Sequence, residues 1–310
     1  MKIAVIGTGG VGGYLAAMLA YHLPQEDSVT VVARGARGKS IEENGLIMHS
    51  ALHGEILARP KVALRTDALG DQDVIFLCVK NYSLENVLEE LRGVVREGTI
   101  LVTLLNGVDP GDRVRKAYPD NPVVDSVIYI VSYANPDYSI RHQSDFAKIR
   151  IGAKDAGARP EAAAAVETVA AVLQKAKVDC RVSRDIVEEI WKKFIVNCGF
   201  NVLTAAYDSN IGPLRADPER SAEFEALSRE ACAVARAQGA AIPDDYEQRV
   251  IDRFYHVYTD EDSSSLQRDV HAGRPAEVET FCGYIVRASQ ALGLEAPVMT
   301  KMYQRLRPDR

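Results

Sequence analysis

Residues 2–12 read KIAVIGTGGVG, a short apolar run that leads directly into a glycine-rich turn. The run is typical of a buried strand, and the residues after the turn have the apolar spacing of a helix. Gly7, Gly9 and Gly12 form a G-x-G-x-x-G pattern, which between a strand and a helix indicates a dinucleotide-binding turn. The first glycine permits the turn, the second lets the backbone approach a pyrophosphate, and the third lets the helix pack on the strand. If the turn binds a dinucleotide, we expect contacts from Gly7, Thr8, Gly9, Gly10, Val11 and Gly12. The alternative is an ordinary strand–helix turn.

The rest of the first half repeats this alternation of strand and helix. Further β-rich runs lie at 29–32, 74–79, 100–105 and 123–131, with helix-like stretches such as 11–23 and 84–92 between them. Near-continuous apolar strands that alternate with helices indicate a parallel sheet covered on both faces. We therefore predict an α/β fold for residues 1–183, a Rossmann-type doubly wound parallel sheet that binds a dinucleotide.

The second half has almost no strand signal. Helical patterns cover about 185–206, 217–239, 244–258, 262–272 and 275–292. Asp185 can cap the first of these helices, so we place a domain boundary after residue 183 and predict an all-α substrate-binding and catalytic domain over 184–310. The alanine-rich stretch 156–171 is expected to form a surface helix.

Composition excludes several classes of protein. The 310 residues are 47% hydrophobic and 26% charged, as in a globular chain of about two domains. The net charge of −6 argues against general binding to nucleic acid or to an anionic membrane. No signal peptide or membrane span is visible, and the five scattered cysteines suggest neither a disulfide framework nor a metal site. We expect a cytoplasmic protein with reduced thiols and no metal; the sequence does not decide between a monomer and a homodimer.

The end of the second strand points to the kind of dinucleotide. An NAD site commonly has Asp or Glu there, to bind the ribose 2′-hydroxyl, but this strand ends in Arg34, with Arg37 and Lys39 close behind. A guanidinium can bind a 2′-phosphate through paired hydrogen bonds, whereas a carboxylate would repel it. The pattern favours NADP(H) over NAD(H); the alternative is that these are solvated loop residues.

Two later strands also end in polar residues. Lys80 follows the run 75–79, and Asn106 follows the run 100–105. Ligands of open α/β sheets bind outside the carboxyl ends of the strands, so both residues are expected near the glycine turn. Each could also be a simple turn residue, but their joint placement favours the site.

A second group of candidates lies on the helix predicted from residue 185. At about 100° per residue, Lys193, Asn197, Asn201 and Thr204 fall within one narrow stripe of an otherwise apolar helix. A buried amide without a partner costs roughly 1–3 kcal/mol, so these groups should face one another, water or a ligand. The stripe indicates a helix that lines a polar cleft; a hydrogen-bond seam between helices is the alternative.

The segment 263–279 contains two further polar features. The serines at 263–265 are typical of a helix N-cap, and residues 273–275 of a helix break. Glu277 follows the break and either caps the next helix or reaches the cleft.

Taken in order, these motifs resemble those of the ketopantoate reductase family. The resemblance rests on the glycine turn, Arg34, Lys80 after VIFLCV, Asn106-Gly107, the helix WKKFIVNCGFN at 191–201 and the segment SSLQRDVHAGRPAEVE at 264–279. It runs from residue 1 to about residue 300. It implies NADPH-dependent reduction of 2-dehydropantoate to (R)-pantoate, on the route to pantothenate and coenzyme A.

The resemblance also implies roles for single residues. Lys193 would be the general acid that protonates the ketone oxygen. The implied substrate-binding residues are Asn106, Asn197, Asn201, Asn210 and Ser265. Asn106 would also lie beside the nicotinamide, Lys80 would touch the cofactor, and Glu277 would bind the nicotinamide ribose. Physical chemistry agrees, because a ketone that accepts hydride gains alkoxide character, and an ammonium stabilises that charge and supplies the proton.

One segment departs from the family pattern. Residues 129–138 read YIVSYANPDY, where the family often has small residues and a proline–glycine turn. A related NADP-dependent reductase of another 2-oxo acid or of an imine is therefore an alternative, and a non-catalytic NADP-sensing protein is a second. A sensor would not need a lysine beside two buried amides.

Overall fold

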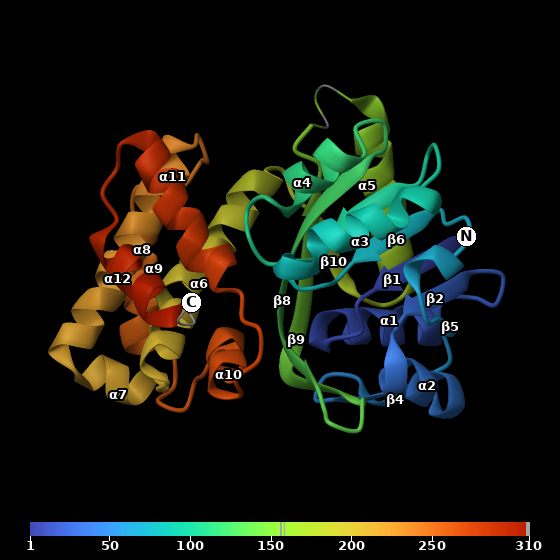
Figure 1. Ribbon diagram of the computed structural model, residues 1–310, viewed down its shortest axis with the longest axis horizontal. Coiled ribbons are helices and arrows are strands. Elements are labelled where there is room, and N and C mark those ends of the chain that lie inside the picture. Colours follow the sequence, from blue (N-terminus) through green and yellow to red (C-terminus); the bar gives the residue numbers. More distant parts are fainter. Residues whose placement is uncertain (156, 158, 308–310) are drawn as a thin grey trace. The chain divides into compact units, whose positions relative to one another are not determined.

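The computed structural model describes residues 1–155, 157 and 159–307 (Figure 1). The chain forms two compact units, Met1–Ile186 and Val187–Arg310. The sequence predicts a boundary after residue 183, and the units divide at the first residue of helix α6. None of the helices in the described part of the chain is both long and apolar enough to cross a membrane.

The first unit is built on a mainly parallel sheet. Over the residues described, ten strands follow the order β4-β3-β9-β8-β7-β6-β1-β2-β5, with β10 paired to β9. The strands are β1 (Lys2–Ile6), β2 (Ser28–Val32), β3 (Leu46–Ser50), β4 (Gly54–Ala58), β5 (Lys61–Ala63), β6 (Val74–Leu77), β7 (Ile100–Thr103), β8 (Val123–Ala134), β9 (Ile140–Gly152) and β10 (Asp179–Val182). The neighbours from β5 to β8 all pair in parallel, which confirms the predicted core. The sheet as a whole is mixed, because β9 is antiparallel to β8 and β4 is antiparallel to β3.

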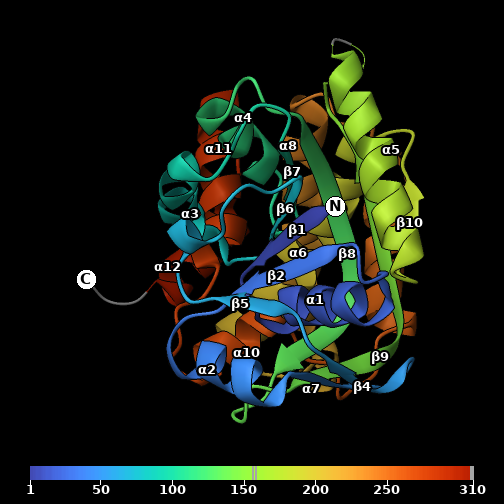
Figure 2. The same cartoon turned by 90° about the vertical axis from the view of Figure 1, so that its right-hand side faces the viewer.

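Helices cover both faces of this sheet. They are α1 (Gly10–His22), α2 (Gly35–Asn44), α3 (Leu84–Glu90), α4 (Pro110–Ala117) and α5 (Pro160–Lys175), with short 3-10 turns η1 (Thr66–Ala68), η2 (Asn81–Ser83) and η3 (Leu91–Gly93). Ile3 and Val5 of β1 pack in the core under α1 and α5, whereas Ala4 and Ile6 pack under α3 and α4. Side chains of a strand alternate between its faces, so one apolar strand serves both cores. Figure 2 shows α1 and α5 on one side of the sheet and α3 and α4 on the other.

Helix α5 lies on the surface, as the alanine-rich sequence predicts, with its outer side exposed and its inner side packed on the sheet. Ala162, Val166, Val169 and Leu173 are buried, so one side of α5 belongs to the core of the sheet. Alanine is compatible with either setting, because a small side chain allows close helix–sheet packing. The beginning of the predicted stretch, Ala156 and Ala158, lies outside the described residues.

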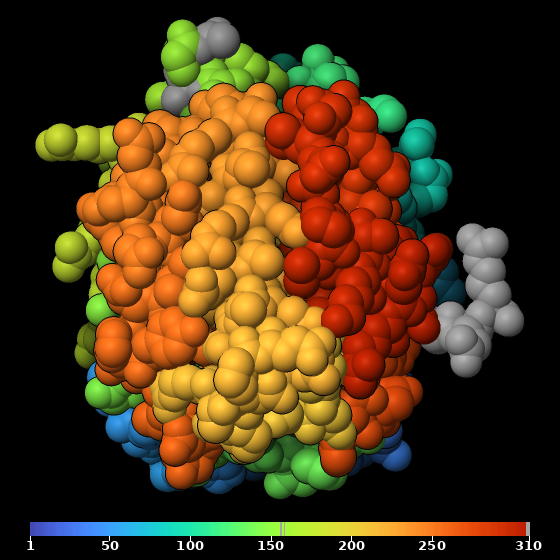
Figure 3. Space-filling model, turned by 90° about the vertical axis from the view of Figure 1, so that its left-hand side faces the viewer, coloured from blue at the N-terminus to red at the C-terminus, as the bar shows by residue number. Residues whose placement is uncertain are grey.

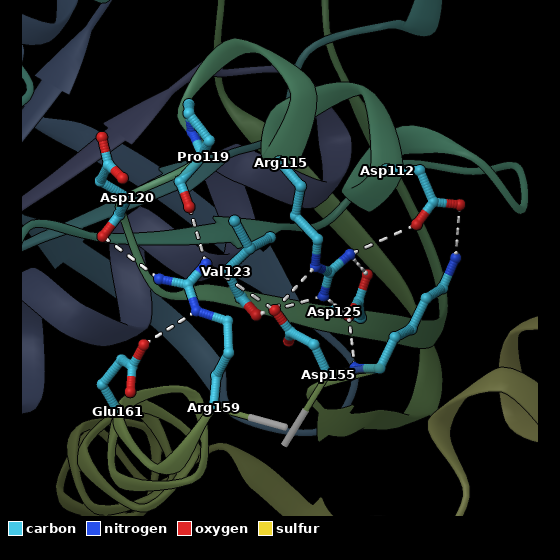
Figure 4. A network of polar contacts seen from close by, with 10 residues as sticks. Asp112, Arg115, Pro119, Asp120, Val123, Asp125, Asp155, Arg159 and Glu161 are labelled. Carbon is cyan, nitrogen blue, oxygen red and sulfur yellow. Dashed lines mark hydrogen bonds and ion pairs between the residues drawn. The ribbon is translucent and has the colours of Figure 1, made fainter. Parts of the chain in front are cut away.

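A buried ion pair holds strand β8 to helix α4. Asp125 of β8 is 1% exposed, and Arg115 of α4 donates to both of its carboxylate oxygens, one of them at 3.2 Å. Asp155 lies 3.5 Å from the same guanidinium, and the Lys154 backbone N–H donates to Asp125 at 3.1 Å. This network ties β8, α4 and the chain before α5 together (Figure 4).

The second unit is helical, as the sequence predicts. It comprises α6 (Ile186–Tyr207), α7 (Ile211–Ala216), α8 (Pro218–Ala237), α9 (Tyr246–His256), α10 (Ser265–His271), a π-helical turn η4 (Glu279–Gly283), α11 (Tyr284–Leu292) and α12 (Pro297–Leu306). Helix α8 contacts α7, α9, α11 and α12, and Figure 3 shows α11 and α12 (red) beside it. Phe194 of α6 packs against Phe281 and Tyr284, which anchors α6 to the segment that follows Glu277.

Candidate active site

The glycine turn has the backbone geometry that its sequence predicts. Gly7 has a φ of +95°, and a Cβ at Gly12 would lie 1.9 Å from the Gly7 carbonyl oxygen, so both positions require glycine. A Cβ at Gly9, by contrast, would meet nothing within 4 Å. No side chain of the described residues caps the N-terminus of α1, which leaves its first amides directed at the open side of the turn. This arrangement fits a pyrophosphate, because a ligand can approach Gly9 closely and accept hydrogen bonds there.

The glycine turn is also braced from two sides. Arg37 donates to the Thr8 carbonyl oxygen and lies 5.5 Å from the centre of the Tyr138 ring. Burial lowers the pKa of this guanidinium. On the other side, the Ser132 hydroxyl donates to the Gly10 carbonyl oxygen at 3.0 Å, and a Cβ at Gly10 would lie 2.3 Å from the Ser132 carbonyl oxygen. Contacts across the sheet therefore hold the turn in place.

Arg34 lies between two cavities next to this turn. One has a volume of about 480 Å³ and is lined by residues of the glycine turn, the end of β2 and the segment 79–87. The other, of about 280 Å³, is lined by Arg34, Arg65, Thr66, Asp67 and Glu90. The Arg34 side chain is 58% exposed and donates to Glu90. Lys39 is 74% exposed and 3.8 Å from Glu43, so it behaves as a solvated surface residue.

Lys80 and Asn106 follow strands that end in register. Ile6 of β1 pairs with Leu77 of β6, which pairs with Thr103 of β7, so the turns after these strands emerge at one edge of the sheet. Asn81 links the two turns, because its side-chain amide donates to the Asn106 carbonyl oxygen at 2.6 Å.

Asn81 is buried and fixed in turn by α4. Arg113 donates to the Asn81 side-chain oxygen at 3.0 Å and to its carbonyl oxygen at 3.1 Å. Asn81 is not among the residues predicted from the sequence, although an asparagine directly after a strand-terminal lysine is a usable signal.

In the second unit, Lys193 of α6 lies near Glu277. Loss of hydration in its surroundings lowers the pKa of the Lys193 ammonium to about 8, while the Glu277 carboxylate acts in the opposite direction and raises it. Glu277 is 4% exposed. A lysine with a pKa near neutral pH can exchange a proton during a reaction, which an ordinary surface lysine does poorly.

The stripe of polar side chains on α6 divides into two parts. Thr204 is fully buried, and its hydroxyl donates to the Phe200 carbonyl oxygen at 2.8 Å and contacts the Ser264 hydroxyl at 2.8 Å. Thr204 therefore belongs to a hydrogen-bond seam between helices, which is the alternative interpretation of the stripe. The side-chain amides of Asn197 and Asn201 have no hydrogen-bond partner among the residues that the structure describes. They lie one and two turns from Lys193 on the same side of α6, which suits ligand contacts.

The segment after α9 places the remaining candidates near this stripe. Ser264 is the N-cap of α10 and accepts from the Gln267 N–H at 3.0 Å, which confirms that the serines cap a helix. Ser265 is the first residue of α10 and is partly exposed. Asn210, the exposed N-cap residue of α7, accepts from the Gln267 side-chain amide at 3.5 Å. Ligand contacts by Ser265, Asn210 and Glu277 stay predictions.

The first unit has the sheet order and glycine turn of a dinucleotide-binding fold, and the second is helical. Comparison with protein families gives the same class. Residues 3–156 match the model for ketopantoate reductase PanE/ApbA, and residues 185–309 match the model for the C-terminal part of that enzyme. The chain therefore belongs to the ketopantoate reductase family, which is a family of oxidoreductases.

Individual relatives cover nearly the whole chain. A 2-dehydropantoate 2-reductase from Mesorhizobium japonicum is 29% identical over 94% of this chain and 91% of that protein. The crystal structure of 2-dehydropantoate 2-reductase from Porphyromonas gingivalis W83 is 30% identical, covers 99% of both chains and has a TM-score of 0.82. A ternary structure of D-mandelate dehydrogenase with NADH and anilino(oxo)acetate has a TM-score of 0.87 at 21% identity, over 99% of this chain and 97% of that one. At that identity the last similarity shows the fold alone.

Proposed function

We propose that this protein reduces 2-dehydropantoate to (R)-pantoate with NADPH. The observation that carries the proposal is Lys193, whose pKa is lowered to about 8 and which shares one side of α6 with two amides that have no partner among the described residues. Membership of the ketopantoate reductase family supports the same reaction.

Residues of the second unit would carry the proton transfer and hold the substrate. NADPH, when bound, supplies a hydride to the carbonyl carbon. The Lys193 ammonium hydrogen-bonds the carbonyl oxygen, stabilises the negative charge that develops there and donates the proton that completes the hydroxyl group. Asn197 and Asn201 orient the substrate through their amides, together with Ser265 and Asn210. Glu277 keeps the pKa of Lys193 high enough for the ammonium form to persist at neutral pH.

Residues of the first unit would hold the dinucleotide. The amides of the glycine turn from Gly7 to Gly12 bind the pyrophosphate, and the Arg34 guanidinium binds the 2′-phosphate. Lys80 and Asn106, at the ends of neighbouring strands, serve the nicotinamide half, and Asn106 also contacts the substrate. From the second unit, Glu277 would bind the nicotinamide ribose.

The direct test is NADPH oxidation followed at 340 nm with 2-dehydropantoate, with NADH and other 2-oxo acids run in parallel. NADPH-selective turnover of 2-dehydropantoate is the expected result. Absence of turnover with every 2-oxo acid would contradict the proposal. Turnover that disappears in Lys193→Ala while NADPH binding persists would exclude a non-catalytic NADP sensor.

A reductase of a different 2-oxo acid is the second candidate. The strand β8 favours it, because this strand carries Val131 and Tyr133, each 38% exposed, in the segment that departs from the family pattern. Bulky side chains there would reshape a substrate site. Phenylglyoxylate belongs in the substrate panel for this reason, and its more efficient turnover would select this candidate.

A further inference from the structure

Glu90 is the acidic partner of the arginine that ends β2. It lies at the end of α3, and the Arg34 guanidinium donates to its Oε2 atom. Fifty-six positions separate the two residues in the sequence, so the pair exists only through the fold. In many dinucleotide-binding proteins the residue at the end of the second strand is itself acidic and accepts from the ribose. Here Arg34 occupies that position, and the acidic residue beside it, Glu90, belongs to α3.

The Glu90 carboxylate is held firmly and stays ionised. The Thr66 hydroxyl donates to Oε2 at 2.7 Å, and the Asn86 amide donates to Oε1 at 2.8 Å. These hydrogen bonds, with the contact to Arg34, lower the pKa of Glu90 despite its partial burial. Three donors from three segments therefore fix one negative charge beside Arg34.

The other charges that line the smaller cavity do not offset this carboxylate. Arg65 donates to Asp67 through two nitrogens, at 3.0 and 2.6 Å, so its charge is already matched. Both residues of that pair are more than half exposed. An anion that binds Arg34 therefore comes close to Glu90 and is repelled by it.

We propose that Glu90 is a specificity-determining residue, whose fixed charge offsets that of Arg34 and weakens the preference for NADPH over NADH. The inference rests on the proposed function, because it takes Arg34 as the group that binds the 2′-phosphate. The phosphate is close to dianionic at neutral pH, so its affinity depends on the net charge around Arg34. The ribose hydroxyl of NADH has no charge and is much less sensitive to Glu90.

The variant Glu90→Gln isolates this effect. Glutamine has the same shape and keeps an oxygen that accepts from Arg34 and Thr66, but it removes the charge. We expect the dissociation constant of NADPH to fall by about three- to tenfold at low salt, because partly exposed charges a few ångströms apart interact by about 1 kcal/mol. The dissociation constant of NADH should change by less than about twofold. The effect should shrink at high ionic strength, where the screening length falls to about 3 Å.

Binding titrations provide the test without any need for turnover. NADPH, NADH, 2′,5′-ADP and 5′-AMP are titrated into the natural protein, Glu90→Gln, Arg34→Gln and the double variant, at low and at high salt. Glu89→Gln is the matched control, because it removes a negative charge from the same helix. The partner of Glu89 is Arg92, at 2.6 Å, and not Arg34. Tighter binding of NADPH and 2′,5′-ADP in Glu90→Gln alone, lost when Arg34 is also replaced, is the expected result.

Three outcomes would overturn the inference. One is unchanged NADPH affinity in Glu90→Gln, and another is an equal gain in Glu89→Gln. The third is weaker NADH binding with NADPH unchanged, which would make Glu90 a ribose ligand. If instead the proposed function is wrong, the natural protein will bind NADPH but will not reduce 2-dehydropantoate.

Discussion

The pH dependence of turnover tests the role of Lys193 most sharply. Burial lowers the pKa of this lysine from 10.5 to about 8. At about 1.36 kcal/mol for each pH unit, the surroundings disfavour the ammonium form by about 3 kcal/mol. A proton donor must be protonated, so kcat should be constant at low pH and fall about tenfold for each pH unit above about 8.

Glu277 sets where this decline begins. Its carboxylate raises the pKa of Lys193, so Glu277→Gln should move the decline to lower pH by about half to one unit. Lys193→Met should lower kcat by about 10²- to 10⁴-fold at every pH. Lys192→Met is the matched control, because Lys192 pairs with Glu188 at 2.5 Å and is expected to leave the pH profile unchanged.

The assay is kcat at saturating NADPH and 2-oxo acid, measured in steps from about pH 6 to about pH 10. Saturation matters because Glu277 is also a proposed ribose ligand, so its replacement can raise KM. A decline at the same pH in the natural protein and in Glu277→Gln would refute the assignment. A decline centred near the ordinary lysine pKa of about 10.4 would refute it as well.

The same pKa predicts a pH-dependent difference in stability. Between about pH 8 and pH 10.5 the folded protein has released the Lys193 proton while the unfolded chain still holds it. The unfolded state then binds more protons, so the free energy of unfolding of the natural protein rises with pH. Relative to Lys193→Met it should gain up to about 3 kcal/mol across this range, measured by urea unfolding at several pH values. Parallel curves for the two proteins would contradict the lowered pKa.

Three further predictions concern packing and binding. Gly12→Ala should lower the free energy of unfolding by about 2–3 kcal/mol, because the new Cβ meets a carbonyl oxygen at 1.9 Å. Gly9→Ala should leave the free energy of unfolding unchanged and weaken NADPH binding by about tenfold. Asp125→Asn should cost about 1–3 kcal/mol in urea unfolding, since it removes the buried carboxylate that accepts from Arg115 while Asp112 and Asp155 still lie 3.5 Å from that guanidinium, and a loss below about 1 kcal/mol would show that the network contributes little. Thr204→Val should lower the free energy of unfolding by about 1–2 kcal/mol, while Asn197→Ala should leave it unchanged and raise KM for the substrate. A stability loss in Asn197→Ala and a raised KM in Thr204→Val would contradict these roles.

The sequence predicts the central parallel strands and misses β9, for a physical reason. Strands β1, β6 and β7 are buried on both faces, so they are continuous apolar runs that composition alone reveals. Strand β9 alternates buried and exposed residues and contains Arg141, Gln143 and Asp145 on its exposed side. Such a strand is stabilised by pairing with β8, and that pairing joins residues 6–27 positions apart.

The candidate site was predictable where its residues share one element. Lys193, Asn197 and Asn201 lie on one helix, so their spacing already shows a common side. The partners that tune the site come from elsewhere. Glu90 reaches Arg34 from another helix, and Asn81 reaches Asn106 from another turn, so only the folded chain reveals them.

The contact between Gly10 and Ser132 has an evolutionary consequence. The register of β8 and β9 shifts between Ile130 and Ser132, and at this irregularity the β8 backbone comes so close to α1 that only a hydrogen fits at position 10. A side chain at position 10 and the present path of β8 exclude each other. The glycine and the strand can therefore change only together, so homologues that differ in one should differ in the other. The divergence of residues 129–138 is thus constrained by a position more than a hundred residues away.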